Sequence, residues 1–246
     1  SRVVLGPLRT FEVAAAGTVL DVVMLGRLER VGVPGLTRWL EQAARASALV
    51  HGKVRPGRVR VVIGAMEDGD YPVVFGVAFR GGGPAVVLLV HKDATEADLK
   101  AEWVAIHELF HLSMPYVRSR DAWLSEGVTM YYSETLRGRL GVLPARRVWQ
   151  RLEDGFERGR RSGSGLTNRE ESERMRQTRA YHRVYWFGAA VALMWDVALR
   201  WDSDGEQSLD DAISWFGAAH LDTPKRWTAE ETMAALDGWY GKPLFS

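Results

Sequence analysis

Two histidines and a glutamate have the types and spacing of a zinc hydrolase site. The segment His107-Glu108-Leu109-Phe110-His111 places both imidazoles on one face of a helix, at positions i and i+4, so that they can bind one metal ion. Glu108 is rotated by roughly 100° from His107, off the metal but near its bound water. Zinc lowers the pKa of that water, and the carboxylate can take its proton. The pattern therefore predicts Glu108 as a general base.

The context of the motif favours the metal over its simplest alternative. The pattern alone arises by chance in roughly one chain of this kind in a hundred, and two core histidines bonded to backbone carbonyls remain an open alternative. The helix is apolar nearly all round, which predicts burial, through Trp103, Val104, Ile106, Leu109, Phe110 and Leu112. Buried imidazoles and carboxylates need polar partners, and a metal ion with its water would supply them.

A catalytic zinc site needs a third protein ligand. The chain has no cysteine, and Met114 and Val117 stand where a longer motif has a glycine and a third histidine. Glu126 lies at the start of a second helical segment, and a turn around Pro115 would bring that helix back across the first. We therefore predict His107, His111 and Glu126 as ligands of one zinc ion. The alternative is that Glu126 is a surface carboxylate stabilised by the helix dipole.

Strands precede helices along the chain. Alternating, β-branched stretches predict strands within 8–25 and at 58–64, 73–79 and 85–90. Helices are predicted at 36–50, from Asp93 or Thr95 to about 113, and at 121–137, 144–158, 185–200, 209–216 and 229–236, with a mobile loop at 160–178. This order predicts an α+β fold. We expect a β-rich lobe with one helix over residues 1–92, and a helical lobe over 93–246 that carries the zinc site, in one catalytic domain overall.

Composition narrows the function classes. The 246 residues are 46% apolar and 26% charged, which is typical of a globular protein and excludes collagen, coiled coils and disorder. A net charge of +1 gives no electrostatic case for nucleic acid or an anionic membrane. Arginines gather at 146–183, and we interpret them as a solvated, salt-bridged helix and loop, with an anionic partner as the alternative. No apolar run reaches about 18 residues, so we expect a soluble fragment without a membrane span. Its first residue is Ser1, so we expect a cut natural N-terminus.

Beyond the motif, the chain resembles a known group of enzymes. HELFH followed by WLSEG resembles the gluzincin metallopeptidases. The segment Glu126–Tyr132 resembles the EGxTxYY segment of the glycyl aminopeptidase family, and Tyr185–Leu193 resembles that family's Y-x-K-G-A helix. The likeness covers roughly 58–245. It implies a thermolysin-like catalytic domain, in which a small mixed sheet binds substrate backbone along its edge strand, and the active-site helix lies between that sheet and a helical part.

The resemblance also implies a role for Tyr185. The tyrosine of related gluzincins at this position donates a hydrogen bond to the oxyanion, which a phenol beside zinc can do. Without the resemblance, Tyr185 would be interpreted as a buried tyrosine with a satisfied hydroxyl. Tyr181 and His182 are weaker candidates for the same role. Members of the family often also have an N-terminal β domain and a C-terminal PDZ-like module. Residues 1–35 are too few for such a β domain, so we expect a chain close to a bare catalytic domain.

The sequence departs from the family in three places. The gap between His111 and Glu126 is short, and Phe187 stands where a lysine is usual. The strand segment 76–83 lacks the glutamate that holds a free amino terminus in the family. Arg80 in this segment could meet a carboxylate instead, or it could be a solvated loop residue.

The sequence therefore predicts a zinc-dependent peptidase with one Zn²⁺ per chain and a peptide or protein substrate. Aminopeptidase and endopeptidase activity both stay open, and the missing acid at 76–83 favours the second. The alternative outside the enzymes is a binding module that kept the gluzincin fold and lost turnover.

Overall fold

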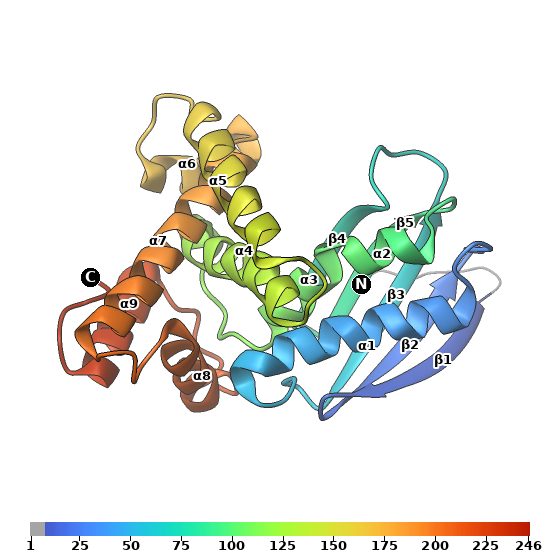
Figure 1. Cartoon of the computed structure of the whole chain (residues 1–246), viewed down its shortest axis with the longest axis horizontal. Helices are drawn as coiled ribbons and strands as arrows, with labels where there is room; N and C mark the ends of the chain where they lie inside the picture. The colour runs from blue at the N-terminus through green and yellow to red at the C-terminus, as the bar shows by residue number, and fades with distance from the viewer. Residues whose placement is uncertain (1–7) are drawn as a thin grey trace. The chain divides into compact units, whose positions relative to one another are not determined.

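The computed structural model describes residues 8–246, and the chain divides after Ser113 into two compact units. The first seven residues of the predicted 1–92 lobe lie outside the described residues. The first unit is built on a five-stranded sheet of β1 (Leu8–Ala15), β2 (Thr18–Leu25), β3 (Arg58–Met66), β4 (Val73–Phe79) and β5 (Ala85–His91), in the order β1-β2-β3-β5-β4 (Figure 1). The three central strands β2, β3 and β5 are parallel, while β1 and β4 are antiparallel edge strands. The predicted mixed sheet and α+β class are confirmed.

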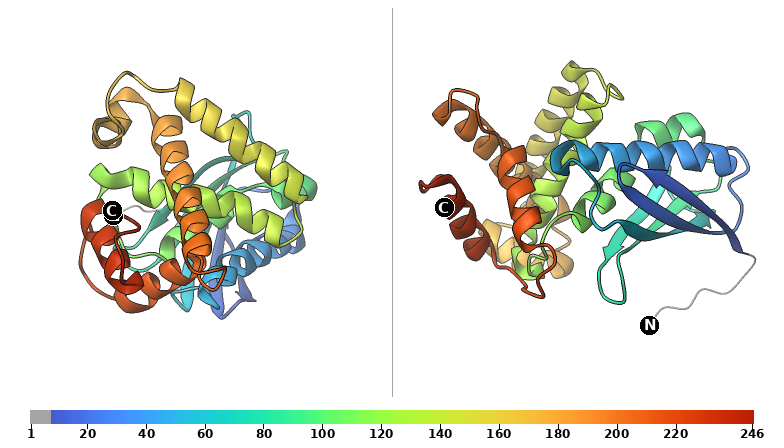
Figure 2. Two further views of the ribbon diagram at one scale, coloured as in Figure 1. Left: turned by 60° about the vertical axis from the view of Figure 1, so that its left-hand side comes forward. Right: turned by 90° about the horizontal axis from the view of Figure 1, so that it is seen from below.

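The alternating sequence of the strands gives the sheet one buried face. Val22 on β2 lies opposite Val61 on β3, which lies opposite Val86 on β5, and all three are at most 1% exposed. Helix α1 (Gly32–His51) runs across the sheet (Figures 1 and 2) and buries the apolar stripe that includes Leu36 and Leu40. Burying each such aliphatic side chain stabilises the unit by about 1.5–3 kcal/mol.

The predicted helix from 93 to 113 is two helices, α2 (Glu96–Ala101) and α3 (Val104–Leu112). Of the two predicted caps, Thr95 rather than Asp93 caps α2, through a capping box with Asp98. Glu102 is extended and breaks the run, because its Oε1 accepts hydrogen bonds from the backbone N–H groups of Trp103 (2.6 Å) and Val104 (3.3 Å). The carboxylate thus satisfies the first donors of α3 and complements its dipole.

The second unit, Met114–Ser246, is helical. It contains a short 3₁₀ turn at Ser119–Asp121 and the helices α4 (Ala122–Arg139), α5 (Ala145–Arg161), α6 (Asn168–Thr178), α7 (Tyr181–Asp202), α8 (Leu209–His220) and α9 (Ala229–Tyr240). Five of these match predicted helices to within a few residues at each end. No helix of the described residues 8–246 has the length and apolarity to cross a membrane.

Helix α6 corrects the prediction of a mobile loop at 160–178. Thr167 and Glu170 form a capping box at its start. Glu171 is fully buried, and its two carboxylate oxygens accept from the backbone N–H of Ser164 (2.6 Å) and the hydroxyl of Thr178 (3.3 Å). The charged composition suggested a loop, but capping and the buried carboxylate stabilise a helix there.

Two glycines set the closest approach between helices in the second unit. A Cβ atom on Gly188 of α7 would lie 1.7 Å from the carbonyl oxygen of Trp123, and one on Gly127 of α4 would lie 2.2 Å from the Cα of Gly188. Neither distance is physically possible for a side chain, so α4 and α7 cross backbone to backbone at this point. On the far side of α7, Trp186 fills the space over Gly155 of α5.

The tyrosines of the EGVTMYY segment tie α4 to its neighbours. The hydroxyl of Tyr131 donates to Asp196 on α7 (2.8 Å), and that of Tyr132 donates to Asp210 on α8 (3.0 Å). Asp196 also accepts from the backbone N–H of Leu209 (2.9 Å), at the start of α8. Burial is the main cause that raises the pKa of both phenols, and the adjacent carboxylates add to it. Both side chains therefore act here as hydrogen-bond donors.

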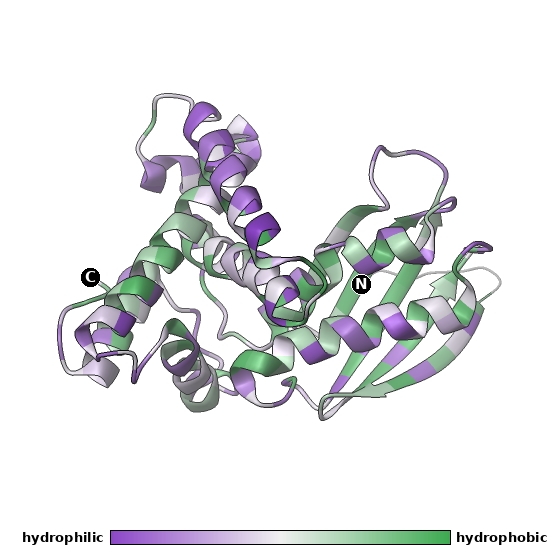
Figure 3. Ribbon diagram, viewed as in Figure 1, coloured by the Kyte–Doolittle hydropathy of each residue, from purple (hydrophilic) through white to green (hydrophobic). Residues whose placement is uncertain are grey.

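Helix α5 carries much of the arginine cluster and is hydrophilic over most of its length (Figure 3). Arg160 and Arg161 both pair with Glu157, at 2.8 and 2.5 Å, within the predicted salt-bridged helix. Arg151 instead pairs with a buried group, because its Nε and Nη2 donate to the carboxylate of Glu134, at 2.8 and 3.1 Å. Buried Arg137 binds the same carboxylate. Removing either arginine would leave a buried charge poorly paired.

We predict that Gly188→Ala lowers the free energy of unfolding by about 3 kcal/mol, because the added methyl group forces α4 and α7 apart. Gly238→Ala on α9 is the matched control, since no atom lies within 4 Å of its Cβ position. It should leave stability unchanged or raise it by up to about 1 kcal/mol, the difference in helix propensity. Urea denaturation of both variants checks this, and equal stability of the two would contradict the close crossing.

Candidate functional site

The two histidines of the motif face each other on α3. Their Nε2 atoms lie 3.1 Å apart, and the ring centroids are separated by 4.7 Å in an edge-on arrangement. His107 is 2% exposed, and His111 is half-buried. Two nitrogens bound at 2.0–2.1 Å to one tetrahedral zinc would lie about 3.3 Å apart. The spacing thus suits a shared metal ion, although without one it also suits a hydrogen bond between the rings.

Glu108 lies against the edge strand β4. Glu108 is 8% exposed. A Cβ atom on Gly76 would lie 2.9 Å from the Cγ of Glu108, 3.0 Å from its Oε1, and 2.4 Å from a methyl of Val104. Only glycine lets the strand come this close to the carboxylate. A glycine inside a predicted strand marks a close approach of another group, so the sequence carries a signal for the contact at Gly76.

Arg80 is the second residue whose role the sequence did not show. The solvated-loop interpretation is wrong, because Arg80 is half-buried and its Nη2 donates a hydrogen bond to the backbone carbonyl of His111. That carbonyl belongs to the last turn of α3, where helix carbonyls lack intrahelical partners and a cation complements the dipole. Arg80 therefore holds the end of the helix that carries both histidines.

Aromatic contacts fix the rest of α3. Trp103 approaches His107 edge-on, with ring centroids 5.2 Å apart. Phe110 packs on His51, at the end of α1, at 5.4 Å. The Nε2 atom of His51 is buried with no hydrogen-bond partner among the described residues. Burial, with the nearby charge of Arg55, lowers the pKa of His51 to about 4, so the ring is neutral near pH 7.

The remaining predicted residues belong to the second unit. Glu126 directly precedes Gly127 on α4, and Tyr185 lies three residues before Gly188 on α7, so both lie within one turn of the backbone crossing. Both are half-buried. Tyr181 contacts Tyr185 ring to ring at 6.5 Å. His182 is exposed and lies on the same first turns of α7.

Of the described residues, His107, His111 and Glu126 are candidates to hold a metal ion. The first two belong to the first unit and the third to the second. An imidazole pair with one carboxylate is a donor set that suits zinc and leaves a coordination position open.

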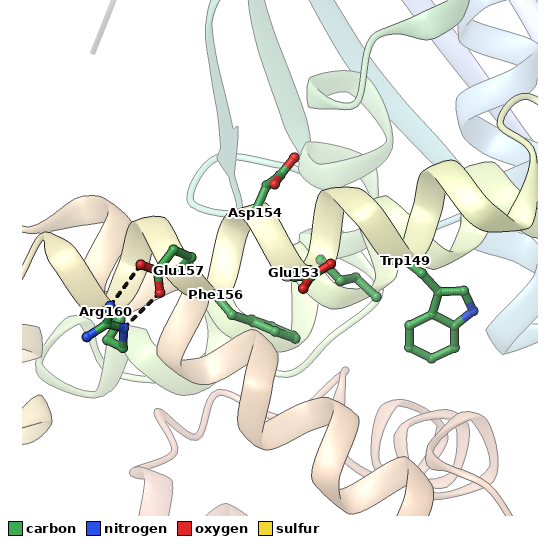
Figure 4. Close-up of a pocket in the computed structure, with 7 residues that line it drawn as sticks. Trp149, Glu153, Asp154, Phe156, Glu157 and Arg160 are labelled. Carbon is green, nitrogen blue, oxygen red and sulfur yellow. Dashed lines mark hydrogen bonds and ion pairs between the residues drawn. The ribbon is translucent and has the colours of Figure 1, made fainter.

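A separate hollow lies along α5 in the second unit. Its lining residues are Trp149, Leu152, Glu153, Asp154, Phe156, Glu157 and Arg160 (Figure 4). None of the predicted site residues lines it. It therefore plays no part in the candidate site.

Comparison with solved structures identifies the fold. The chain is similar to an aminopeptidase N family protein from Idiomarina loihiensis, with a TM-score of 0.76, 18% identity, and coverage of 98% of this chain and 47% of that one. It is similar to yeast LTA4 hydrolase in complex with bestatin, with a TM-score of 0.63, 14% identity, and coverage of 96% and 37%. It is also similar to an M1 zinc metallopeptidase from Deinococcus radiodurans, with a TM-score of 0.62, 16% identity, and coverage of 98% and 51%.

The fold is thus that of zinc metallopeptidases of the gluzincin group. Within that group it is of the M1 type. The chain spans about half, or less, of the length of these structures. The sequence matched no protein-family model and no curated protein.

We predict that the free energy of unfolding falls between pH 6.5 and 4 because of His51. The unfolded chain binds this proton near pH 6.5, but the folded chain binds it only near pH 4, so acid favours unfolding across that interval. The contribution is about 3 kcal/mol in full. Urea unfolding at several pH values should show a shallower decline for His51→Gln than for the parent. An identical decline in the two proteins would exclude His51 as its cause.

Proposed function

We propose that this chain is a zinc-dependent peptidase. The observation that carries the proposal is the pair of Nε2 atoms, 3.1 Å apart, on a buried helix whose Glu108 lies between them in sequence. Burying one imidazole and a carboxylate on nine helical residues, with a second imidazole half-buried, is costly unless they have polar partners, and a metal ion with its water is such a partner. The M1-type fold supports the same class of chemistry.

In this proposal His107, His111 and Glu126 hold one zinc ion. The donor types and their burial suit a metal ion. Glu126 would be placed by the crossing of α4 and α7, where Gly127 fixes the helix next to it. The short chain between His111 and Glu126 includes the 3₁₀ turn at Ser119–Asp121, which leads directly into α4.

Each catalytic group has one task. A zinc ion bound there would polarise the scissile carbonyl and lower the pKa of a water molecule. Glu108 takes a proton from the attacking water and later passes it to the leaving amine. Tyr185 donates a hydrogen bond to the oxyanion that develops on the substrate carbonyl. Tyr181 packs on Tyr185 and steadies its ring.

The finer family assignment is part of the proposal. The EGVTMYY segment and the helix that begins near Tyr185 resemble the glycyl aminopeptidase family, with a thermolysin-like catalytic arrangement. Tyr131 and Tyr132 of that segment have a structural role, because their hydroxyls donate hydrogen bonds to Asp196 and Asp210. These two hydrogen bonds stabilise the packing of α4 against α7 and α8, and this role does not depend on the substrate.

We predict about one zinc per chain in the purified parent, and loss of zinc in His107→Ala and Glu126→Ala. Inductively coupled plasma mass spectrometry measures this directly. Glu108→Gln should keep the zinc and lose peptide hydrolysis by about two to four orders of magnitude, because the general base is gone.

Two outcomes would overturn parts of this assignment. Retained full activity in Glu108→Gln would exclude Glu108 as the base. No zinc in the parent, even after reloading, would exclude the metal site and point to the alternative of a binding module that kept the fold and lost turnover.

We further propose that cleavage does not depend on a free amino terminus. The strand and loop segment Val73–Gly83 contains no acidic residue that could hold an ammonium group. An endopeptidase needs no such group, since it binds a chain that continues on both sides.

We predict that a peptide and its N-acetylated form are cleaved at similar rates, within about threefold, since no lost ion pair penalises the second. Mass spectrometry of the products gives both the rate and the cleaved bond. Loss of cleavage on acetylation would show that another residue binds the amino terminus, and would favour the aminopeptidase.

A further inference from the structure

The outward face of helix α7 is apolar although it is exposed. Met194, Val197 and Trp201 on this face are 67%, 57% and 87% exposed. The opposite face is buried within the second unit, where Ala192 and Leu199 are both 0% exposed. A helix that is apolar on both faces is normally covered on both, and an exposed apolar stripe marks an interaction site. The outward face of α7 therefore has the character of an interface.

This face is continuous and carries no charge. It spans about 120° of the helix around Met194, at roughly 100° per residue. It consists of seven apolar residues, each exposed or half-buried: Phe187, Ala190, Val191, Met194, Val197, Ala198 and Trp201. The charged residues of the same stretch, Asp196 and Arg200, lie off this face and pair with each other at 3.2 Å. Helix α7 is accordingly largely apolar along this stretch (Figure 3).

The residue types on the outward face follow the same order in both directions from Met194. The symmetric pairs are Val191 with Val197, Ala190 with Ala198, and Phe187 with Trp201. A two-fold axis that pairs one helix with a second copy of itself in antiparallel orientation makes the two surfaces identical, so each must be complementary to itself. With the axis at Met194, each residue of the face meets the residue at the same separation on the other side. Valine then meets valine, alanine meets alanine, and one aromatic ring meets another.

The sizes of these residues suit a close pair of helices. Packed helices have axes about 8–10 Å apart, and the small side chains at 190 and 198 permit the shorter distances. Met194 on the axis is unbranched and adapts its shape to its own copy. At each end of the face, Phe187 would cover Trp201 of the second copy, and large aromatic side chains dominate the energetics of interfaces.

The two ends of the face carry opposite charges. Arg183 lies one turn before Phe187, and Asp204 and Glu206 follow directly after the end of α7 at Asp202. Among residues 8–246, none forms an ion pair with Arg183, Asp204 or Glu206, and the Nε of Arg183 is buried without a hydrogen-bond partner. With the axis at Met194, position 183 meets position 205 of the second copy, between the two carboxylates. An antiparallel pair thus joins unlike charges, whereas a parallel pair would join like charges.

We propose that this chain forms a two-fold symmetric dimer, in which the outward face of α7 packs antiparallel on the same face of a second copy, with Met194 on the axis. Seven residues from each copy make an interface at the small end of the range for specific complexes, so we expect a Kd on the order of 10 µM. The dimer goes beyond the proposed peptidase function and does not depend on it.

The test of the dimer is sedimentation equilibrium of the full chain, from about 1 to 200 µM, around the expected Kd. The mass should rise from the 27.5 kDa of one chain towards twice that value. Met194→Glu should raise the Kd at least about tenfold, because two carboxylates would face each other on the axis. Trp149→Glu is the matched control, since Trp149 is 59% exposed on α5, away from this face, and it should leave the Kd unchanged.

Cross-linking tests the register, because the chain has no cysteine of its own. Met194→Cys should form a disulfide with its own copy, since facing Cα atoms of closely packed helices lie within disulfide range. An equimolar mixture of Val191→Cys and Val197→Cys should cross-link more than either variant alone. Ala218→Cys, exposed on α8, should stay uncross-linked. Oxidised glutathione accepts the two electrons from each thiol pair, and non-reducing electrophoresis measures the product.

A monomer at every concentration would overturn the proposal and leave this face to a different protein. A dimer whose Kd is unchanged by Met194→Glu would overturn it as well. Cross-linking of Val191→Cys alone that equals the mixture would exclude the antiparallel register. Circular dichroism shows whether each variant keeps its fold, and if Met194→Glu fails to fold, the cysteine variants decide the question.

Discussion

The burial of ionisable groups on a nine-residue helix is the constraint on which the first unit depends. Helix α3 buries His107 and Glu108 among residues that are otherwise apolar. Its first N–H groups are satisfied by the Glu102 carboxylate, and the carbonyl of His111 in its last turn accepts from Arg80. Charges at both ends thus compensate the helix dipole. Burying polar side chains in the middle of such a helix is costly unless they have polar partners, and the proposed metal ion with its water would be one such partner.

Glycine makes the required approaches possible in both units. Gly76 lets a strand meet the Glu108 carboxylate, and Gly127 and Gly188 let two helices meet at their backbones. Gly76 contacts Glu108 itself, Glu126 directly precedes Gly127, and Tyr185 lies about one turn before Gly188. Each close contact thus lies at or beside a candidate catalytic or metal-binding residue. Close backbone packing leaves few alternative positions for those side chains, so it orders them.

Local patterns predicted what depends on local physics. The i and i+4 spacing of His107 and His111 follows from helical periodicity, and the alternation of β2 and β5 follows from the strand period. The helix break at Glu102 and helix α6 were missed, because both depend on where a carboxylate finds its donors after folding. The bond from Arg80 to His111 joins residues 31 positions apart, and no local pattern encodes that distance. The proposed role of Tyr185 came from resemblance alone.

The edge strand β4, which the family resemblance predicts to bind substrate backbone, carries a hazard as well. Val73–Phe79 reads VVFGVAF, with no charge and no proline, and Phe75 is 49% exposed. Natural sheets commonly protect such edges with lysine, proline or a bulge. In the pairing of β4 with β5, the register shifts between Val73 and Phe75, which is an irregularity of the bulge type. The same hydrogen-bonding groups that would accept a substrate can pair with β4 of another molecule. Concentrated protein should therefore tend to aggregate through this strand, and a peptide bound there would act as a solubilising ligand.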